Sequence, residues 1–184
     1  MKKTMFITSL FLMLCLVSNS SNAQTKSEKK DVPKRCLAQG SLILLEDNKT
    51  KTVESLKEGD IIKTYNPITQ QYVLKPVMKL HKVASLQTFH VVLENRSSLQ
   101  LTADHPLLSL DGWKSMRPDD TKEHGYTEVK ALNDGDELLF FNKDEISSIK
   151  VIKIIPETKY YDTYTIELDG DEVIIANGFL VGQE

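Results

Sequence analysis

Two stretches of the chain resemble each other and decide the expected fold: Ser55–Asn66 reads SLKEGDIIKTYN, and Ala131–Asn142 reads ALNDGDELLFFN. Both follow the pattern Leu-x-x-Gly-Asp-x-aliphatic, and they begin 76 residues apart. A single copy would carry little weight, because such a turn commonly leads into a strand. The repetition predicts two β subdomains related by an approximate two-fold axis, with a functional site at the seam between them.

The segments around these copies favour an all-β domain. They are short runs of Val, Ile, Leu, Thr and Tyr separated by Gly, Asn and Asp, and no stretch keeps a helical apolar period for three turns. The segment after the first copy, Thr88–Leu108, also matches the segment after the second, Asp162–Val181. We expect strands at residues 41–45, 60–65, 72–84, 88–94, 99–102, 137–141, 146–155, 162–168 and 172–176.

Composition places the chain among ordinary globular proteins. Of its 184 residues, 40% are apolar and 27% are charged, which predicts one domain with its own core and excludes a disordered tail or a multi-span membrane protein. The formal charge of −3 gives no electrostatic reason to expect nucleic-acid binding, which needs clustered Lys and Arg.

Residues 1–23 are typical of a secretory signal peptide. Lys2 and Lys3 precede an apolar run from Met5 to Val17, and the small residue Ala23 predicts cleavage between Ala23 and Gln24. We therefore expect a secreted or periplasmic protein with no stable membrane anchor after cleavage. The apolar run is too short for a spanning helix. A lipoprotein anchored through Cys15 is disfavoured because Leu14 stands where a small residue would be expected.

After the signal peptide the chain divides at Cys36. Residues 24–35 read QTKSEKKDVPKR, a polar segment that we expect to be a disordered arm, whereas residues 36–184 form the folded domain. Removal of the signal peptide leaves Cys36 as a single thiol, so an internal disulfide is impossible. It can be a buried spectator, a tether to another protein through a disulfide, or a nucleophile.

The second feature with chemical potential is Thr102-Ala103-Asp104-His105-Pro106, which follows an expected strand. A thiol that attacks a carbonyl needs an acid for the departing nitrogen and a donor for the developing oxyanion. His105 and Thr102 suit these two tasks. Alone, His105 would more simply begin the turn before Pro106, and it is the combination with Cys36 that favours catalysis.

Together these motifs resemble the Hint domains of inteins, bacterial intein-like proteins and Hedgehog proteins, from Cys36 to Val181. The order and spacing of the short blocks carry the resemblance. The blocks are CLAQGS at 36–41, LKEGDII at 56–62, LTADHP at 101–106, GW at 112–113, ALNDGDEL at 131–138, YYDTYTI at 160–166 and IANGFLV at 175–181. The resemblance implies a horseshoe of two pseudo-symmetric β subdomains.

The resemblance also implies a reaction, an N-to-S acyl shift at the Arg35-Cys36 bond. Cys36 would attack the Arg35 carbonyl to give a thioester, and His105 would protonate the leaving nitrogen. Thr102 would polarise the carbonyl, Asp104 would support the site, and Asp162 matches an aspartate that tunes the cysteine in related domains. The domain would then be a single-turnover cysteine-dependent enzyme that acts on its own N-terminal segment.

The chain departs from the family at its C-terminal block. Gly182 and Gln183 stand where full inteins have His-Asn, so we expect N-terminal cleavage without splicing, with water or an external thiol or amine resolving the thioester. The alternative is a catalytically degenerate Hint fold that acts as a binding or presentation module. We expect a monomer without cofactor, and no metal, because His81, His90 and His124 lack ligand spacing.

Overall fold

The computed structural model describes residues 35–122, 126–170 and 173–183. The chain divides into two units, and every described residue belongs to the second unit, residues 32–184. The expected signal peptide, its cleavage site between Ala23 and Gln24, and the arm up to Lys34 lie outside the described residues. Among the described residues, no helix is both long and apolar enough to cross a membrane.

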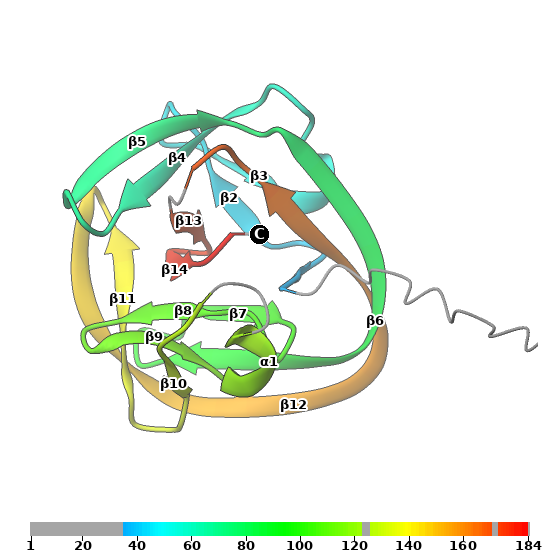
Figure 1. The fold of residues 1–184 in the computed structure, drawn as a ribbon, viewed down its shortest axis with the longest axis vertical. Helices are drawn as coiled ribbons and strands as arrows, with labels where there is room; N and C mark the ends of the chain where they lie inside the picture. Colours follow the sequence, from blue (N-terminus) through cyan, green and yellow to red (C-terminus); the bar gives the residue numbers. More distant parts are fainter. Residues whose placement is uncertain (1–34, 123–125, 171–172, 184) are drawn as a thin grey trace, which may run out of the picture. The chain divides into compact units, whose positions relative to one another are not determined.

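Over these ranges the second unit is almost entirely antiparallel β-structure, which confirms the all-β prediction (Figure 1). Apart from a 3-10 turn at Val53–Ser55 and one short helix, the elements are strands. They are β1 (Leu37–Ala38), β2 (Leu42–Leu44), β3 (Thr50–Thr52), β4 (Ile61–Asn66), β5 (Gln71–Pro76), β6 (Lys79–Leu93), β7 (Ser98–Leu101), β8 (Leu107–Ser109), β9 (Gly112–Ser115), α1 (Pro118–Lys122), β10 (Val129–Ala131), β11 (Glu137–Asn142), β12 (Glu145–Glu167), β13 (Val173–Ala176) and β14 (Phe179–Val181).

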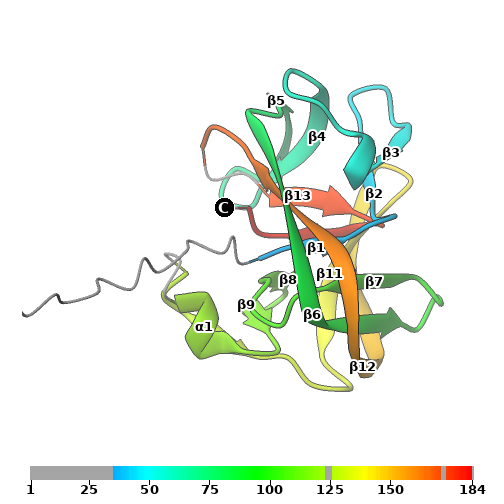
Figure 2. The same ribbon diagram turned by 90° about the vertical axis from the view of Figure 1, so that its right-hand side faces the viewer.

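Two long strands, β6 and β12, join the halves of this unit. They run side by side in Figure 2 and curve around β13 and β14 in Figure 1. Their antiparallel ladder extends from Val151 opposite Leu93 to Glu167 opposite Lys79, with two register shifts along it. Such bulges bend a strand and increase its twist, which allows the ladder to curve. Because β6 follows the first sequence repeat and β12 the second, this ladder connects the two repeats.

The first repeat forms a compact turn before β4. The backbone N–H of Gly59 donates to the Val77 carbonyl at 2.8 Å, and the N–H of Val77 returns a bond to the Asp60 carbonyl at 2.9 Å. The Asp60 carboxylate accepts from the N–H of Lys57 at 2.7 Å. Gly59 has a φ of 87°, a left-handed conformation that favours glycine.

The second repeat makes the same bonds before β11. Gly135 donates to the Val151 carbonyl at 2.8 Å, and Val151 donates to the Asp136 carbonyl at 2.8 Å. The Asp136 carboxylate accepts from the N–H of Asn133 at 2.8 Å, and Gly135 has a φ of 91°. This bond-by-bond correspondence agrees with the predicted two-fold relation between the repeats.

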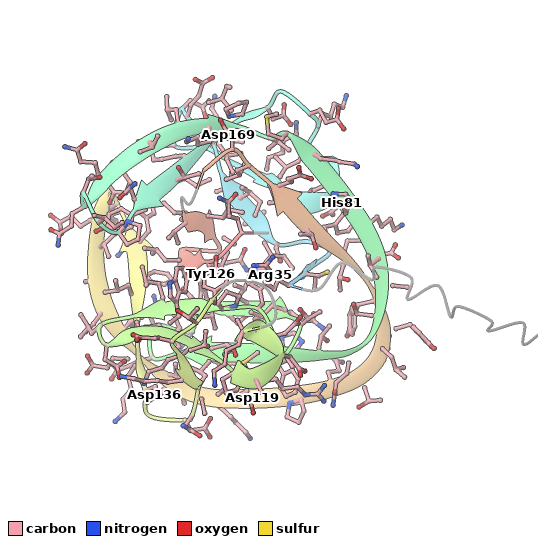
Figure 3. The ribbon with its side chains drawn as sticks, in the orientation of Figure 1. Arg35, His81, Asp119, Tyr126, Asp136 and Asp169 are labelled. Atoms are coloured by element: carbon pink, nitrogen blue, oxygen red, sulfur yellow. The ribbon has the colours of Figure 1, made fainter. Side chains whose placement is uncertain are left out.

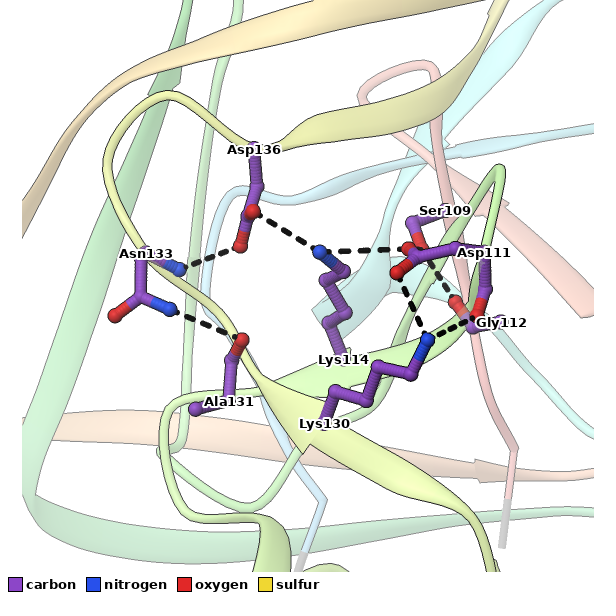
Figure 4. Close-up of polar contacts among 8 residues, drawn as sticks. All are labelled: Ser109, Asp111, Gly112, Lys114, Lys130, Ala131, Asn133 and Asp136. Carbon is purple, nitrogen blue, oxygen red and sulfur yellow. Dashed lines mark hydrogen bonds and ion pairs between the residues drawn. The ribbon is translucent and has the colours of Figure 1, made fainter.

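Each repeat turn is also tied to a lysine, but the two lysines differ in burial. Lys51 contacts Asp60 at 2.6 Å and its side chain is 30% exposed. Lys114 lies between Asp136 at 3.0 Å and Asp111 at 3.4 Å, and its side chain is only 11% exposed (Figure 4). The second turn is therefore fastened to the β8–β9 hairpin through a nearly buried cation.

The strand limits differ from the sequence expectations in one instructive way. The expected strand at residues 72–84 is broken at Val77, because its N–H and carbonyl bond to the Gly59-Asp60 turn instead of a neighbouring strand. Conversely, residues 85–87 continue as strand, so β6 runs unbroken from Lys79 to Leu93, and β12 likewise joins two expected strands. The short strands β1, β3, β8, β9, β10 and β14 and the helix α1 were not among the expected elements.

We expect Asp136→Ala to destabilise the protein more than Asp60→Ala. Both substitutions remove the acceptor for a turn N–H, but only Asp136→Ala takes the nearer carboxylate from a nearly buried lysine. Losing a partner of a buried charged group costs about 2–3 kcal/mol, against about 1 kcal/mol for the more exposed pair. Urea denaturation of the two variants measures the difference, and equal losses would contradict it.

Candidate active site

Cys36 is held immediately before β1, in the interior of the domain. Its neighbour Leu37 pairs with Leu101 on β7 and with Tyr164 on β12, and all three side chains belong to the main core. Cys36 itself is fully buried. The apolar anchor at Leu37 therefore fixes the thiol between two strands that come from different repeats.

A threonine on β12 contacts both partners of the expected acyl shift. Thr165 Oγ1 lies 3.1 Å from Cys36 Sγ, and the same hydroxyl donates toward the Arg35 carbonyl oxygen at 3.4 Å. When the hydroxyl proton points to the carbonyl, the thiol proton can point to Oγ1. Thr165 thus aligns the sulfur and the carbonyl that it would attack.

Thr102 lies at the nitrogen side of the Arg35-Cys36 bond. The N–H of Cys36 donates to Thr102 Oγ1 at 3.0 Å, and the N–H of Thr102 donates to the Cys36 carbonyl at 3.0 Å. The sequence led us to expect this hydroxyl at the carbonyl oxygen. The structure instead places it on the amide nitrogen, and Thr165 occupies the position at the oxygen.

Asp104 and the backbone of Arg35 define the acyl side of the bond. The N–H of Arg35 donates to Asp104 Oδ2 at 3.2 Å, so the Asp104 carboxylate contacts the residue on the acyl side of the bond. Arg35 has a φ of 68°, a left-handed conformation that costs a non-glycine residue about 1–2 kcal/mol. The residue that would donate the acyl group is thus held in a strained backbone conformation.

His105 is brought to the cluster by a turn, in which its N–H donates to the Thr102 carbonyl at 3.2 Å. Its Nε2 lies 3.0 Å from the Gly182 carbonyl oxygen. Because a carbonyl can only accept, Nε2 carries the proton of the neutral ring and Nδ1 keeps its lone pair. Among the described residues, Nδ1 has no hydrogen-bond partner of good geometry. The Cys36 backbone nevertheless acts on the ring and raises its pKa.

Burial lowers the pKa of His105 from 6.5 to about 4. The Asp104 carboxylate opposes this shift, and the positive charge of Arg35 adds to it. The imidazole is therefore neutral at pH 7, and its basic nitrogen is Nδ1.

Asp162 is not part of this cluster, contrary to the expectation from the resemblance. Its carboxylate lies on the surface, 2.7 Å from Lys82 Nζ, an interaction that raises the pKa of Lys82. Side chains alternate between the faces of a strand, so the three-residue step from Asp162 to Thr165 places them on opposite faces of β12. Only the backbone carbonyl of Asp162 contributes near the site, by accepting from Gln39 at 2.9 Å.

Three site components escaped the sequence analysis. Thr165 could have been found only if the register of β12 against β1 had been known. The Gly182 carbonyl is a backbone group and leaves no signal in the sequence. Tyr126 lies outside every motif, yet its hydroxyl donates to the Gln183 carbonyl at 3.3 Å. No cluster of three metal-binding side chains occurs in the described part of the chain.

The lowered pKa of His105 predicts a specific loss of stability in acid. The unfolded histidine takes up a proton near pH 6.5, whereas the folded one resists protonation down to about 4. Its contribution is thus complete above pH 6.5 and is lost as the pH falls toward 4, up to about 3 kcal/mol. Urea denaturation between pH 7 and 4 should show this loss in the free energy of unfolding. In the His105→Gln variant, the free energy of unfolding should fall less over the same pH range. Parallel pH profiles for both proteins would contradict the assignment.

No family model matches the sequence, and no curated protein is similar to it. The fold, in contrast, is similar to solved inteins. The DnaB intein from Synechocystis sp. PCC 6803 matches with a TM-score of 0.67 at 20% identity, over 81% of this chain and 98% of that one. A bacterial intein-like domain from Clostridium thermocellum matches with a TM-score of 0.64 at 17% identity, over 83% and 100%. The TvoVMA intein matches with a TM-score of 0.63 at 16% identity, over 81% and 97%.

At these identities the likeness concerns the fold, and it agrees with the order of the sequence blocks. Three features of this chain accompany that likeness. They are the repeated Gly-Asp turns, the β6–β12 ladder and the buried Cys36 before β1. The chain therefore has the fold of the Hint domains, the all-β fold of inteins and of bacterial intein-like domains.

Proposed function

We propose that this chain is an autoprocessing domain that converts its own Arg35-Cys36 peptide bond into a thioester. The observation that carries the proposal is the shared hydroxyl of Thr165, which contacts Cys36 Sγ at 3.1 Å and the Arg35 carbonyl oxygen at 3.4 Å. Acyl transfer requires the nucleophile and the target carbonyl to be close together, and one hydroxyl that contacts both holds them in that arrangement.

The acyl shift involves only atoms of Arg35 and Cys36, apart from the group that carries the proton. A bond forms between Cys36 Sγ and the carbonyl carbon of Arg35, and the bond between that carbon and the Cys36 nitrogen breaks. The proton lost by the thiol ends on the nitrogen, which becomes an amine. Thr165 donates to the carbonyl oxygen as negative charge develops there, which is the task of an oxyanion donor.

The neutral His105 is the group suited to carry the proton. Its Nε2 proton is held by the Gly182 carbonyl, so Nδ1 can accept a proton from the thiol and return it to the leaving nitrogen. Because the pKa of about 4 leaves His105 neutral at pH 7, the proton that it gives to the nitrogen is the one it takes from the thiol. Thr102 Oγ1 meanwhile accepts from the nitrogen throughout and stabilises it as it becomes an amine.

The thioester would be resolved by water or by an external thiol or amine. If the signal peptide is removed after Ala23, the product released is the polar segment Gln24–Arg35. Secretion is part of this proposal and rests on the sequence of residues 1–23. Cleavage without splicing is proposed because Gly182 and Gln183 replace the His-Asn pair of full inteins.

Intact mass spectrometry of the chain from Gln24, made in a protease-deficient host, tests the acyl shift. We expect a mass loss equal to residues 24–35 that dithiothreitol and hydroxylamine accelerate, because both attack thioesters. Cys36→Ala should abolish the loss, and His105→Ala should slow it by about 10²-fold or more. An unchanged mass in the unmodified protein would reject the proposal and favour the alternative of a degenerate Hint fold that binds or presents a partner.

The role of Thr165 has a matched control on the same strand. Thr163 is equally buried, but its hydroxyl donates to the Val83 carbonyl at 2.8 Å and contacts Ser85 at 2.8 Å, away from Cys36. We expect Thr165→Val to slow hydroxylamine cleavage by about 10²-fold, the usual effect of losing an oxyanion donor. Thr163→Val should leave the rate within about threefold. Similar rates for both variants would show that Thr165 does not act on the carbonyl.

A further inference from the structure

We propose that Tyr126, supported by Trp113, forms a recognition site for arginine at the residue before Cys36, so that the domain selects the acyl donor that it cleaves. The inference rests on the proposed function and deepens it, because it names a specificity determinant outside the reacting groups. It concerns the side chain of Arg35, whereas the acyl shift involves only the Arg35 carbonyl.

The Arg35 side chain is buried where a polar arm meets the domain. The residue is only 5% exposed, and its guanidinium carbon lies 5.5 Å from the centre of the Tyr126 ring. Figure 3 shows the two side chains beside each other near the C-terminal strand. A guanidinium over an aromatic face is a cation–π contact, which strengthens when both groups are removed from water.

Tyr126 is held in place by contacts that do not involve Arg35. Its ring packs edge-on against Trp113, with the ring centres 5.0 Å apart and the planes at 81°. Its hydroxyl donates to the Gln183 carbonyl at 3.3 Å, and a Cβ added at Gly182 would clash with that hydroxyl oxygen. The packing against Trp113, the bond to Gln183 and the close backbone at Gly182 together restrict the ring. A rigid ring loses little entropy on contact, which favours recognition.

The chemistry of this contact favours arginine over other residues. A guanidinium is planar and weakly hydrated, so it stacks on a ring at a smaller desolvation cost than a lysine ammonium. Methionine is also a long, unbranched side chain but carries no charge. We expect the order Arg, Lys, Met at position 35 for the rate of thioester formation.

The test combines substitutions at both positions in the chain from Gln24. Hydroxylamine cleavage is timed by intact mass for Arg35, Arg35→Lys and Arg35→Met, each with Tyr126, Tyr126→Phe or Tyr126→Leu. With tyrosine we expect arginine to exceed methionine about tenfold, the size that a desolvated cation–π contact supports. Phenylalanine should retain most of this preference because it keeps the ring, and leucine should reduce the ratio to about one.

Tyr72 supplies a matched control. Lys63 lies 5.5 Å from the centre of the Tyr72 ring, which packs edge-on against Phe141 at 5.6 Å and 84°. Tyr72→Leu therefore removes a similar cation–aromatic arrangement elsewhere in the fold. It should leave the preference for arginine over methionine at position 35 unchanged, whereas a changed preference would mean that the effect of Tyr126 is general destabilisation.

A second measurement does not require the acyl shift. In a Cys36→Ala chain, trypsin should cut after Arg35 slowly, because the side chain is held under Tyr126, and Tyr126→Leu should speed this cut at least fivefold.

If the unmodified chain shows no hydroxylamine cleavage, the proposed function fails, and this measurement still decides whether Tyr126 holds Arg35. Equal hydroxylamine cleavage of the unmodified and Arg35→Met chains would overturn the specificity while leaving the acyl shift intact. Rapid trypsin cleavage that is independent of Tyr126 would overturn the contact itself.

Discussion

The antiparallel ladder between β6 and β12 is the constraint on which the remaining structure depends, because it fixes the face that each residue of β12 presents to the first repeat. Strand β1 pairs with β12 and with β7, through Leu37 opposite Tyr164 and opposite Leu101. With this register, Thr165 lies beside the Cys36 sulfur. A slip of one residue would turn Thr165 to the other face of the strand and remove its contact with Cys36. The chemistry that we propose at Cys36 thus depends on a strand register that is set along β6 and β12.

Burial determines which form of each group is available for chemistry. A protonated imidazole would be costly in the interior, so His105 is held neutral, and the Gly182 carbonyl selects the tautomer that leaves Nδ1 unprotonated. The two threonines divide the peptide bond between them, one at the nitrogen and one near the oxygen. For the proposed reaction, the site would therefore supply one base, one acceptor for the leaving nitrogen and one donor for the oxygen.

The sequence predicted the all-β class and the two-fold relation, and five of the residues that it singled out, Arg35, Cys36, Thr102, Asp104 and His105, lie together, because local turn chemistry and block order leave signals in the chain. It failed where the answer depends on register or on the backbone. Asp162 was expected at the site, but strand alternation turns it to the surface, and Thr165 takes a place that no motif marks. The break at Val77 was also missed, since only the bonds of the distant Gly59-Asp60 turn reveal it.

In the proposed reaction, the departure of Arg35 would itself prevent reversal. The strained backbone at Arg35 relaxes once the residue is no longer held between Asp104 and Thr165. Its positive charge, which helps to lower the pKa of His105, leaves the interior together with the arm. Burial, the largest cause of the lowered pKa of His105, does not depend on that charge. Cleavage would accordingly remove both the acyl donor and the strain that its held conformation stores, as a single-turnover reaction requires.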